Sequence, residues 1–188
     1  MQSVKAERLP GLGVVPSRQR TRVDSLLRWG VVLLAAGLVF VIYSAIHQRV
    51  VVAGDTAPDF TITADSGQTV SVPNFGGKLL ILNFWASWCP PCVQETPSLS
   101  QLAQQFKDKG VVVLALSVDK DAAAYQAFLQ KFHPAFLTAR DSKLHQDFGT
   151  FMYPETYIID AKGKVVKKIA EGADWSDPTI TQYINSLL

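Results

Sequence analysis

The sequence predicts an α/β domain with a mostly parallel sheet and an antiparallel edge, preceded by one transmembrane helix. Two continuous apolar runs, 79–86 and 111–118, are typical of buried central strands, and a helical pattern follows each of them. Residues 155–172 then read as two strands around a turn, which indicates a hairpin. The chain has 188 residues, of which 48% are hydrophobic, so one domain can form a core without help from a disulfide.

The net charge of +2 is unevenly distributed along the chain. Six basic and two acidic residues precede Trp29, whereas 12 basic and 14 acidic residues follow it. The basic excess therefore belongs to residues 1–25, which we expect to form a flexible cytoplasmic tail. The remainder carries no stripe of Arg and Lys, so nucleic acid is not expected as a partner.

The run WGVVLLAAGLVFVIYSAI, residues 29–46, contains no charge. As a helix it would span about 27 Å, close to the hydrocarbon core of about 30 Å. We expect a signal-anchor helix over 26–46, a linker over 47–56 and a folded domain over 57–188. A cleaved signal peptide is the alternative, although its apolar core is typically only about 7 to 15 residues long. Because the basic residues precede the span, the N-terminus is expected inside and the domain outside the membrane.

The first elements of the domain are expected around a Ser66–Gly67 turn, with one short strand on each side. A buried strand at 79–86 follows. The helix after it presents one apolar face and ends near Gly110. That face consists of Val93, Leu99, Leu102, Ala103 and Phe106.

The second half of the domain continues the alternation of strands and helices. After the strand at 111–118, the pattern predicts a helix over 121–132 and a short strand in AFLTARD. A short helix in KLHQDFG stops at Gly149, and the hairpin over 155–172 turns at 161–164. A helix over 176–187 closes the chain.

Both cysteines of the chain lie in NFWASWCPPCVQETP, where the strand at 79–86 passes into the next helix. Pro90 and Pro91 fit the first helical positions, where a missing N–H costs nothing, so Cys89 is expected to be the N-cap. The positive end of the helix favours a thiolate there. We expect Cys89 to be the exposed nucleophile and Cys92 to close back onto it. The Cys89–Cys92 disulfide is then the redox group, and no separate cofactor is needed.

Two other uses of the cysteine pair have less support. A structural disulfide across two intervening residues removes little chain entropy and stabilises weakly. A metal site needs further ligands, and His47, His133 and His145 have no zinc-like spacing from the pair or from one another. A CxxC within an α/β pattern instead indicates a redox centre without metal.

The two prolines bear on the direction of electron flow. An N-cap side chain accepts hydrogen bonds from the N–H of the second or third helical residue, and Pro91 removes the first of these donors. The dipeptide adds no cation either. We therefore expect the pKa of Cys89 to be nearer the thioredoxin value of about 7 than the value of about 3.5 of a strong oxidant. A less stabilised thiolate means a more negative potential, so the pattern favours a protein that donates electrons.

Two further residues are candidates for the site. Glu95 follows Cys92 by three residues and lies on the same helical face. It is either a solvated glutamate or a carboxylate that takes the proton of Cys92. Pro154 precedes the strand at 155–160 and marks a strand start, an edge or a cis turn.

The stretches GGKLLILNFWASWCPPCVQETP, VVVLALSVD and FMYPETYIIDAKGKVV resemble the TlpA/ResA-like thioredoxin family within the AhpC/TSA–redoxin superfamily. The match covers about residues 54–188. It implies a thioredoxin fold with an N-terminal β-hairpin and a central α/β insertion. It also implies a membrane-anchored thiol-disulfide oxidoreductase on the outer side of the bacterial cytoplasmic membrane.

The resemblance also assigns roles to residues. In the family, the residue matching Cys89 attacks, the one matching Cys92 resolves, and a buried glutamate matching Glu95 tunes the thiols. Pro154 matches the cis-proline. Tyr153 stands where a smaller residue is common, at a position whose backbone pairs with the substrate.

The remaining residues around the motif are expected to be walls of the site: Trp85, Trp88, Pro90 and Pro91. The implied partners are protein disulfides, often those of apocytochrome c, and a membrane-embedded thiol carrier that supplies electrons. The PET that follows Tyr153 is similar to that of cytochrome c maturation members.

Three alternatives remain at this point. A disulfide oxidase or isomerase of the same fold would differ in redox potential. A peroxiredoxin-like peroxidase would carry Thr three residues before the reactive cysteine, where this chain has Ala86. A binding module that only keeps the fold would not need Cys89.

Overall fold

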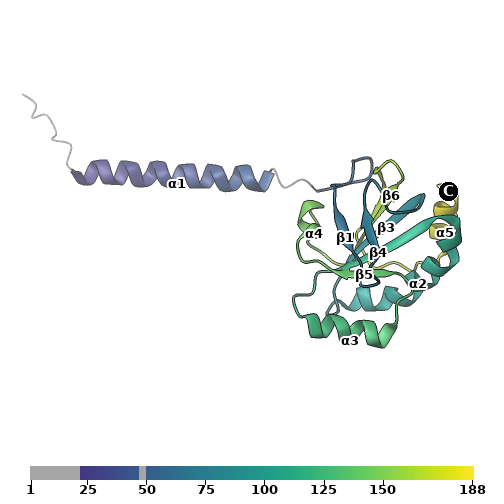
Figure 1. Cartoon of the computed structure of the whole chain (residues 1–188). Helices are drawn as coiled ribbons and strands as arrows, with labels where there is room; N and C mark the ends of the chain where they lie inside the picture. Colours follow the sequence, from purple (N-terminus) through teal and green to yellow (C-terminus); the bar gives the residue numbers. More distant parts are fainter. Residues whose placement is uncertain (1–21, 47–49) are drawn as a thin grey trace, which may run out of the picture. The chain divides into compact units, whose positions relative to one another are not determined.

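The computed structural model describes residues 22–46 and 50–188 and contains two compact units, Met1–His47 and Gln48–Leu188 (Figure 1). In the first unit, α1 runs from Arg22 to Ile46. Its segment Asp24–Ser44 has a mean hydropathy of 2.2, so α1 has the length and composition of a membrane anchor or a signal sequence.

The helix α1 begins four residues before the predicted boundary at 26. No Gly or Pro interrupts residues 22–25, and the acidic Asp24 in the first turn is favourable at the positive helix end. The rest of the predicted basic tail lies outside the described residues.

The second unit is built on a five-stranded sheet in the order β5-β4-β3-β6-β7. The pairs β3–β4 and β4–β5 are parallel, whereas β3–β6 and β6–β7 are antiparallel, so half of the pairings are parallel. The antiparallel β6–β7 pair is the predicted hairpin. A separate antiparallel hairpin, β1–β2, precedes the sheet. The strands are β1 (Thr61–Thr63), β2 (Thr69–Ser71), β3 (Leu79–Trp85), β4 (Val111–Ser117), β5 (Leu137–Arg140), β6 (Glu155–Asp160) and β7 (Val165–Ile169).

The helices of this unit follow the predicted order. They are α2 (Pro90–Phe106) with a 3₁₀ turn η1 (Lys107–Lys109), α3 (Ala122–Phe132), α4 (Leu144–Asp147) and α5 (Pro178–Ser186). The turn after η1 needs Gly110, whose φ of 89° lies in the left-handed region. Between β4 and α4, the segment with α3 and β5 is the predicted insertion.

The central strand β3 is buried over its whole length and presents alternate residues to two cores. Leu80, Leu82 and Phe84 pack in a cluster with residues of the hairpin and of α4. Leu79 and Ile81 pack against α2 and α5. Trp85, on the same face, packs against α3.

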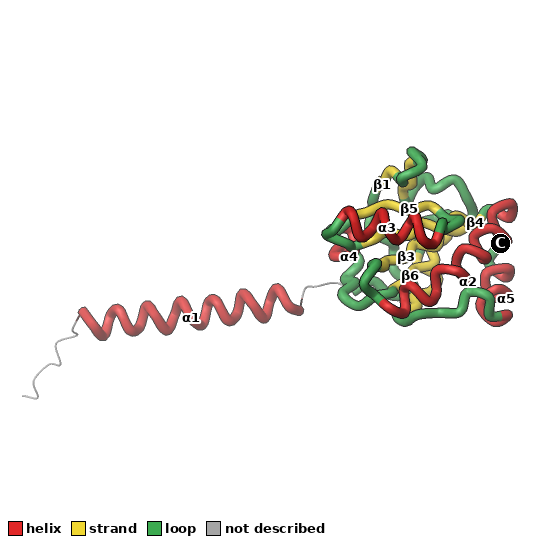
Figure 2. The backbone as a smooth tube through the Cα atoms, turned by 90° about the horizontal axis from the view of Figure 1, so that it is seen from below, coloured by secondary structure: helices red, strands yellow, loops and turns green. Residues whose placement is uncertain are grey.

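Three helices therefore cover one face of the sheet, and the hairpin and α4 cover the other. In Figure 1, α2 and α3 lie below the strands, and Figure 2, seen from below, has them in front. At the carboxyl end of β3, Trp85 packs in a cluster with Phe128 of α3, Cys89 and Cys92, and here the chain passes into the cysteine motif.

The domain begins earlier than the predicted boundary at 57. Val51 is buried, and its N–H donates to the carbonyl of Phe148 at 3.0 Å. The N–H of Gly54 donates to Val165 at 2.8 Å. The second half of the predicted linker, 47–56, is therefore part of the domain, because an apolar side chain and backbone hydrogen bonds attach it there.

We predict that Phe148→Ala lowers the free energy of unfolding by about 3 to 5 kcal/mol. Phe148 is fully buried, and its ring lies 4.8 Å from Tyr157 and 5.4 Å from Phe84 between centroids. The matched control is Phe151→Ala in the same loop, because Phe151 is 74% exposed. Urea unfolding of the full chain in detergent should give a change within about 0.5 kcal/mol for the control. Equal effects would contradict this packing.

Candidate active site

The cysteine motif forms the junction between β3 and α2. Cys89 is the N-cap of α2, with φ −97° and ψ 107°, and its sulfur accepts from the N–H of Cys92 at 3.3 Å. Pro90 and Pro91 occupy the first two helical positions and have no N–H to donate. The predicted capping geometry is confirmed, and a single backbone donor reaches the Cys89 sulfur from α2.

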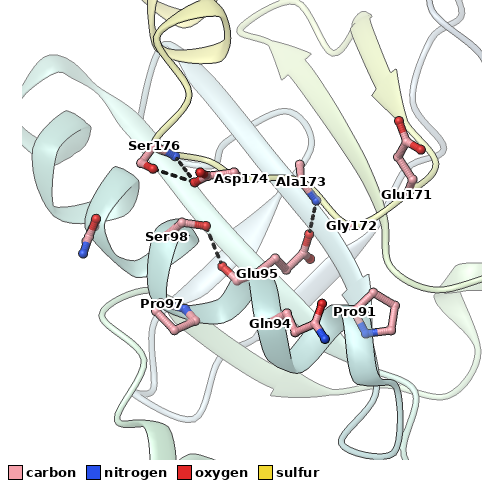
Figure 3. Close-up of a pocket in the computed structure, with 11 residues that line it drawn as sticks. Pro91, Gln94, Glu95, Pro97, Ser98, Glu171, Gly172, Ala173, Asp174 and Ser176 are labelled. Atoms are coloured by element: carbon pink, nitrogen blue, oxygen red, sulfur yellow. Dashed lines mark hydrogen bonds between the residues drawn. The ribbon is translucent and has the colours of Figure 1, made fainter.

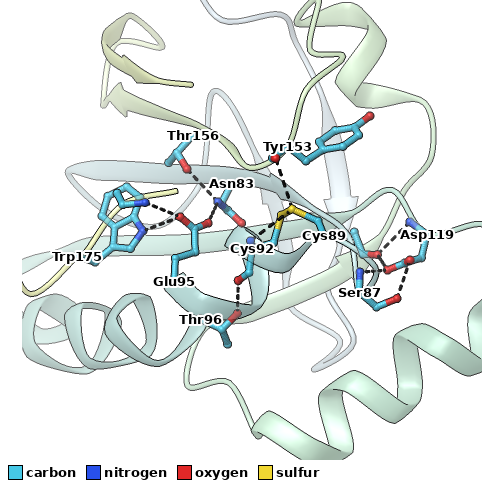
Figure 4. Close-up of a disulfide and its surroundings, with 12 residues drawn as sticks. Asn83, Ser87, Cys89, Cys92, Glu95, Thr96, Asp119, Tyr153, Thr156 and Trp175 are labelled. Atoms are coloured by element: carbon cyan, nitrogen blue, oxygen red, sulfur yellow. Dashed lines mark hydrogen bonds between the residues drawn. A yellow bond between two sulfur atoms is a disulfide. The ribbon is translucent and has the colours of Figure 1, made fainter. Parts of the chain in front are cut away.

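Cys89 and Cys92 are joined by a disulfide. Cys89 is 4% exposed and Cys92 is 1% exposed, so the prediction of an exposed Cys89 is wrong for this oxidised form. The reason is the loop before β6, since the carbonyl oxygen of Tyr153 lies 3.4 Å from the Cys89 sulfur (Figure 4). The peptide bond between Tyr153 and Pro154 is cis, as the resemblance implies.

Glu95 is a buried carboxylate, 4% exposed, rather than a solvated one. Its Oε1 accepts from Asn83 Nδ2 at 2.9 Å. Its Oε2 accepts from the N–H of Ala173 at 3.1 Å and from Trp175 Nε1 at 3.4 Å. Burial raises the pKa of Glu95 above its usual range, and these three donors oppose the rise.

Asn83 connects this carboxylate to the sheet. It lies on β3, is 2% exposed, and also donates to Thr156 Oγ1 at 2.9 Å. In Figure 4 the carboxylate of Glu95 is directed toward Asn83 and Trp175. Among the described residues, no hydrogen bond joins Glu95 to either cysteine.

The loop between β7 and α5 packs over the first turns of α2. A Cβ on Gly172 would lie 3.0 Å from the Cβ of Pro91, so a side chain there would require Pro91 to shift by a few tenths of an ångström. Trp175 is fully buried, and its backbone N–H donates to Ser98 Oγ at 3.1 Å. Between the loop and α2 lies an open groove of about 700 Å³, shown in Figure 3. Pro91, Glu95 and Glu171 are among its lining residues.

The predicted wall residues divide into two groups. Trp88 is 66% exposed and meets the ring of Tyr153 edge-on, with centroids 6.0 Å apart. Pro90 and Pro91 are also exposed. Trp85 is 3% exposed and packs under the motif against Phe128 of α3, so it belongs to the framework and not to the wall.

A second buried carboxylate fixes the segment before Cys89. Asp119, two residues after β4, is 1% exposed. Its Oδ2 accepts from the N–H of Ser87 at 2.8 Å and from Ser117 Oγ at 2.6 Å, and its Oδ1 accepts from Ser87 Oγ at 2.9 Å. Two of these three donors come from Ser87, so the carboxylate ties the loop that carries Trp88 and Cys89 to the end of β4.

Three partners at the site were missed by the sequence reasoning: Asn83, Asp119 and Trp175. Asn83 has a signal of its own, because it is the one clearly polar residue in the apolar run at 79–86. Trp175 has none, since it meets Glu95 from 80 residues away. In the described part of the chain, no three His, Cys, Asp or Glu residues are grouped so that they could hold a metal.

A family comparison identifies the domain. The Redoxin family matches residues 52–184, which is more than half of the chain. The chain belongs to the Redoxin family.

Individual relatives agree with this assignment. A thiol-disulfide oxidoreductase ResA of Bacillus thuringiensis subsp. konkukian is 34% identical over 118 residues, which cover 62% of this chain and 68% of the relative. A ResA of Geobacillus thermodenitrificans is 32% identical over 159 residues, which cover 82% of this chain and 90% of the relative. The thioredoxin-like protein YneN of Bacillus subtilis is 37% identical over 115 residues, which cover 60% of this chain and 68% of the relative.

Solved structures agree as well. A Chlorobium tepidum protein assigned as thiol:disulfide interchange protein DsbE has a TM-score of 0.66 and 29% identity, and covers 74% of this chain and 99% of its own. A thiol-disulfide oxidoreductase from Bacteroides fragilis has a TM-score of 0.60 and 25% identity, and the match covers 71% of this chain and 100% of that protein. The predicted thioredoxin-like fold is confirmed, and the protein is a thiol-disulfide oxidoreductase.

We predict that Glu95 makes the stability of the domain depend on pH. Its pKa is raised in the folded chain above the usual 4.5, so between these two values the folded chain holds a proton that the unfolded chain has released. The free energy of unfolding therefore falls as the pH rises through this window and is level above it. Glu95→Gln should remove that fall.

Urea unfolding of the full chain at a series of pH values measures this effect. The stability of wild type relative to Glu95→Gln should be greatest at the acid end and decrease as the pH rises. Glu171→Gln is the matched control, because Glu171 lines the same groove but is exposed, and it should change the profile less. A wild-type advantage that grows with pH would contradict the raised pKa.

Proposed function

We propose that this protein reduces disulfides of other proteins through a mixed-disulfide mechanism at Cys89 and Cys92. In the reduced protein the Cys89 thiolate attacks a substrate disulfide, and one substrate sulfur leaves as a thiolate. Cys92 then attacks the Cys89 sulfur, which releases the second substrate thiol and forms the Cys89–Cys92 disulfide. Two electrons pass from the cysteine pair to the substrate. The proximity of the two cysteines, which are joined by a disulfide at the start of α2, supports this role for the pair.

The observation that carries the reducing direction is the single N–H at the Cys89 sulfur. Only Cys92 of α2 donates to it, because Pro90 and Pro91 have no backbone donor. A thiolate with one charge-assisted hydrogen bond is less stabilised than one with two or with a neighbouring cation. A less stabilised reduced form gives up electrons more readily.

Glu95 is the proposed acceptor of the Cys92 proton. Cys92 must lose its proton before it attacks the mixed disulfide, and Glu95 lies one helical turn beyond it. The raised pKa of Glu95 brings the carboxylate closer to neutral pH, where a base is most effective. Since the carboxylate is bonded to Asn83, Ala173 and Trp175, transfer from Cys92 requires an intervening water.

The proposed location is the outer face of a bacterial cytoplasmic membrane, with α1 as an uncleaved anchor. The Asp24–Ser44 segment is long and apolar enough to cross the bilayer, and the basic residues precede it. The proposed substrates are protein disulfides presented there, including those of the haem-binding cysteines of apocytochrome c. The proposed electron source is a thiol carrier within the membrane. The resemblance of the PET segment after Tyr153 supports the cytochrome c assignment.

The tyrosine before the cis-proline is proposed to face the substrate. Its carbonyl oxygen is already in contact with the Cys89 sulfur, and Trp88, Phe151 and Met152 around it are all more than half exposed. An extended polypeptide next to the disulfide would meet this apolar surface.

We predict that Cys92→Ala traps the partner. Cys89 can still attack, but the mixed disulfide has no internal thiol to release it. Expression of the full chain in its native membrane, a non-reducing gel and mass spectrometry of the captured band should identify proteins with extracytoplasmic cysteines.

The matched control is the double variant Cys89→Ala/Cys92→Ala, which should capture nothing. Glu95→Gln should form the same mixed disulfides as wild type but release them more slowly. Full turnover in Cys92→Ala, or the absence of any captured protein, would contradict the mechanism.

A further inference from the structure

The side chain of Tyr153 is held by His145, a residue outside the cysteine site. The Tyr153 hydroxyl lies 3.1 Å from His145 Nδ1, and the two rings meet edge-on with centroids 5.9 Å apart. The same ring also meets the ring of Trp88 edge-on, with centroids 6.0 Å apart. Because the carbonyl of Tyr153 contacts the Cys89 sulfur, one residue connects His145 to the reacting atoms.

The imidazole of His145 has an oxygen partner at each ring nitrogen. Nε2 lies 3.1 Å from the carbonyl oxygen of Ser142, and Nδ1 lies 2.9 Å from the carbonyl oxygen of Thr150 and 3.1 Å from the Tyr153 hydroxyl. Where Nδ1 carries the proton, its N–H is in reach of both Thr150 and Tyr153, and where it does not, the Tyr153 hydroxyl can donate to it. In both tautomers the hydroxyl is within hydrogen-bond distance of Nδ1.

The tyrosine is suited to remain a donor. Burial and the nearby charge of Glu155 raise the pKa of Tyr153 above its usual value, so the hydroxyl keeps its proton. The hydroxyl can therefore donate to Nδ1 as well as accept from it.

His145 also fixes the start of the segment that ends at Tyr153. Its carbonyl accepts from the N–H of Thr150 at 2.8 Å, in addition to the contact through its ring. The segment is thus attached to His145 at both Thr150 and Tyr153. Phe151 and Met152 lie between these two points and are 74% and 61% exposed.

We propose that His145 is a positioning residue that, through the Tyr153 hydroxyl, holds residues 150–154 as the docking edge for polypeptide disulfides. A polypeptide attacked by Cys89 has to lay its backbone along this segment, so the segment must be in place before it binds. A small disulfide needs only the Cys89 sulfur. His145 therefore contributes to a preference for protein disulfides, an inference that rests on the proposed substrate-facing role of Tyr153.

Two variants of His145 separate this role from general support of the fold. The amide of Asn lies near the position of Nδ1 and offers both a donor and an acceptor, so His145→Asn can still form a hydrogen bond with Tyr153. The amide of Gln lies near the position of Nε2, so His145→Gln keeps the contact with Ser142 and loses the one with Tyr153. A residue that only stabilised the loop would respond similarly to both changes.

The test measures second-order rate constants of the reduced full chain in detergent with insulin and with 5,5′-dithiobis(2-nitrobenzoate). Insulin is the protein disulfide and the nitrobenzoate is the small one. We expect His145→Gln to lower the rate constant for insulin about three- to tenfold, the effect of one hydrogen bond. His145→Asn should keep most of the insulin rate. Both variants should react with the small disulfide at the wild-type rate.

A double-variant cycle checks that the effect passes through the hydroxyl. Tyr153→Phe removes only that group, so it should lower the insulin rate by the same factor as His145→Gln, and the combined variant should lose no more. The inference would be overturned if the losses of the two single variants multiplied in the combined variant. It would also be overturned if His145→Gln lowered the rate constants for insulin and for the small disulfide equally, or left the rate constant for insulin unchanged. If the wild-type chain reduces neither disulfide, the proposed function fails first and the inference with it.

Discussion

The site depends on the hydrogen bond between the N–H of Cys92 and the sulfur of Cys89. It exists because β3 is buried on both faces and passes, within four residues, into α2. The same bond caps the helix and stabilises a thiolate, so one contact serves both the fold and the chemistry. With prolines at the first two helical positions, no other N–H of α2 is available to strengthen it.

Two buried carboxylates surround this junction with opposite consequences. Asp119 is saturated by donors from Ser87 and Ser117, and it fixes the loop that precedes Cys89. Glu95 is bound by three donors, one from β3 and two from the loop between β7 and α5, yet its pKa is still raised by burial. One carboxylate is therefore structural, while the other is suited to exchange a proton.

Much of this arrangement was predictable from local sequence patterns. The apolar runs at 79–86 and 111–118 predict the central strands, and the Pro90–Pro91 pair predicts the cap at Cys89, because each signal acts over a few residues. The burial of Cys89 was not predictable, since it depends on the carbonyl of Tyr153, 64 residues away. The partners of Glu95 depend in the same way on tertiary packing, and only the polar Asn83 within an apolar strand indicates them.

The reduction potential of the Cys89–Cys92 pair tests the central claim most directly. Titration of the full chain in thiol–disulfide buffers should place it nearer the thioredoxin value of about −270 mV than the strong-oxidant value of about −120 mV. Pro91→Ala restores one N–H at the sulfur and should make the potential less negative by about 10 to 30 mV. Pro90→Ala adds an N–H at the first helical position and should change it less. A wild-type potential near about −120 mV, or equal shifts in the two variants, would contradict the account.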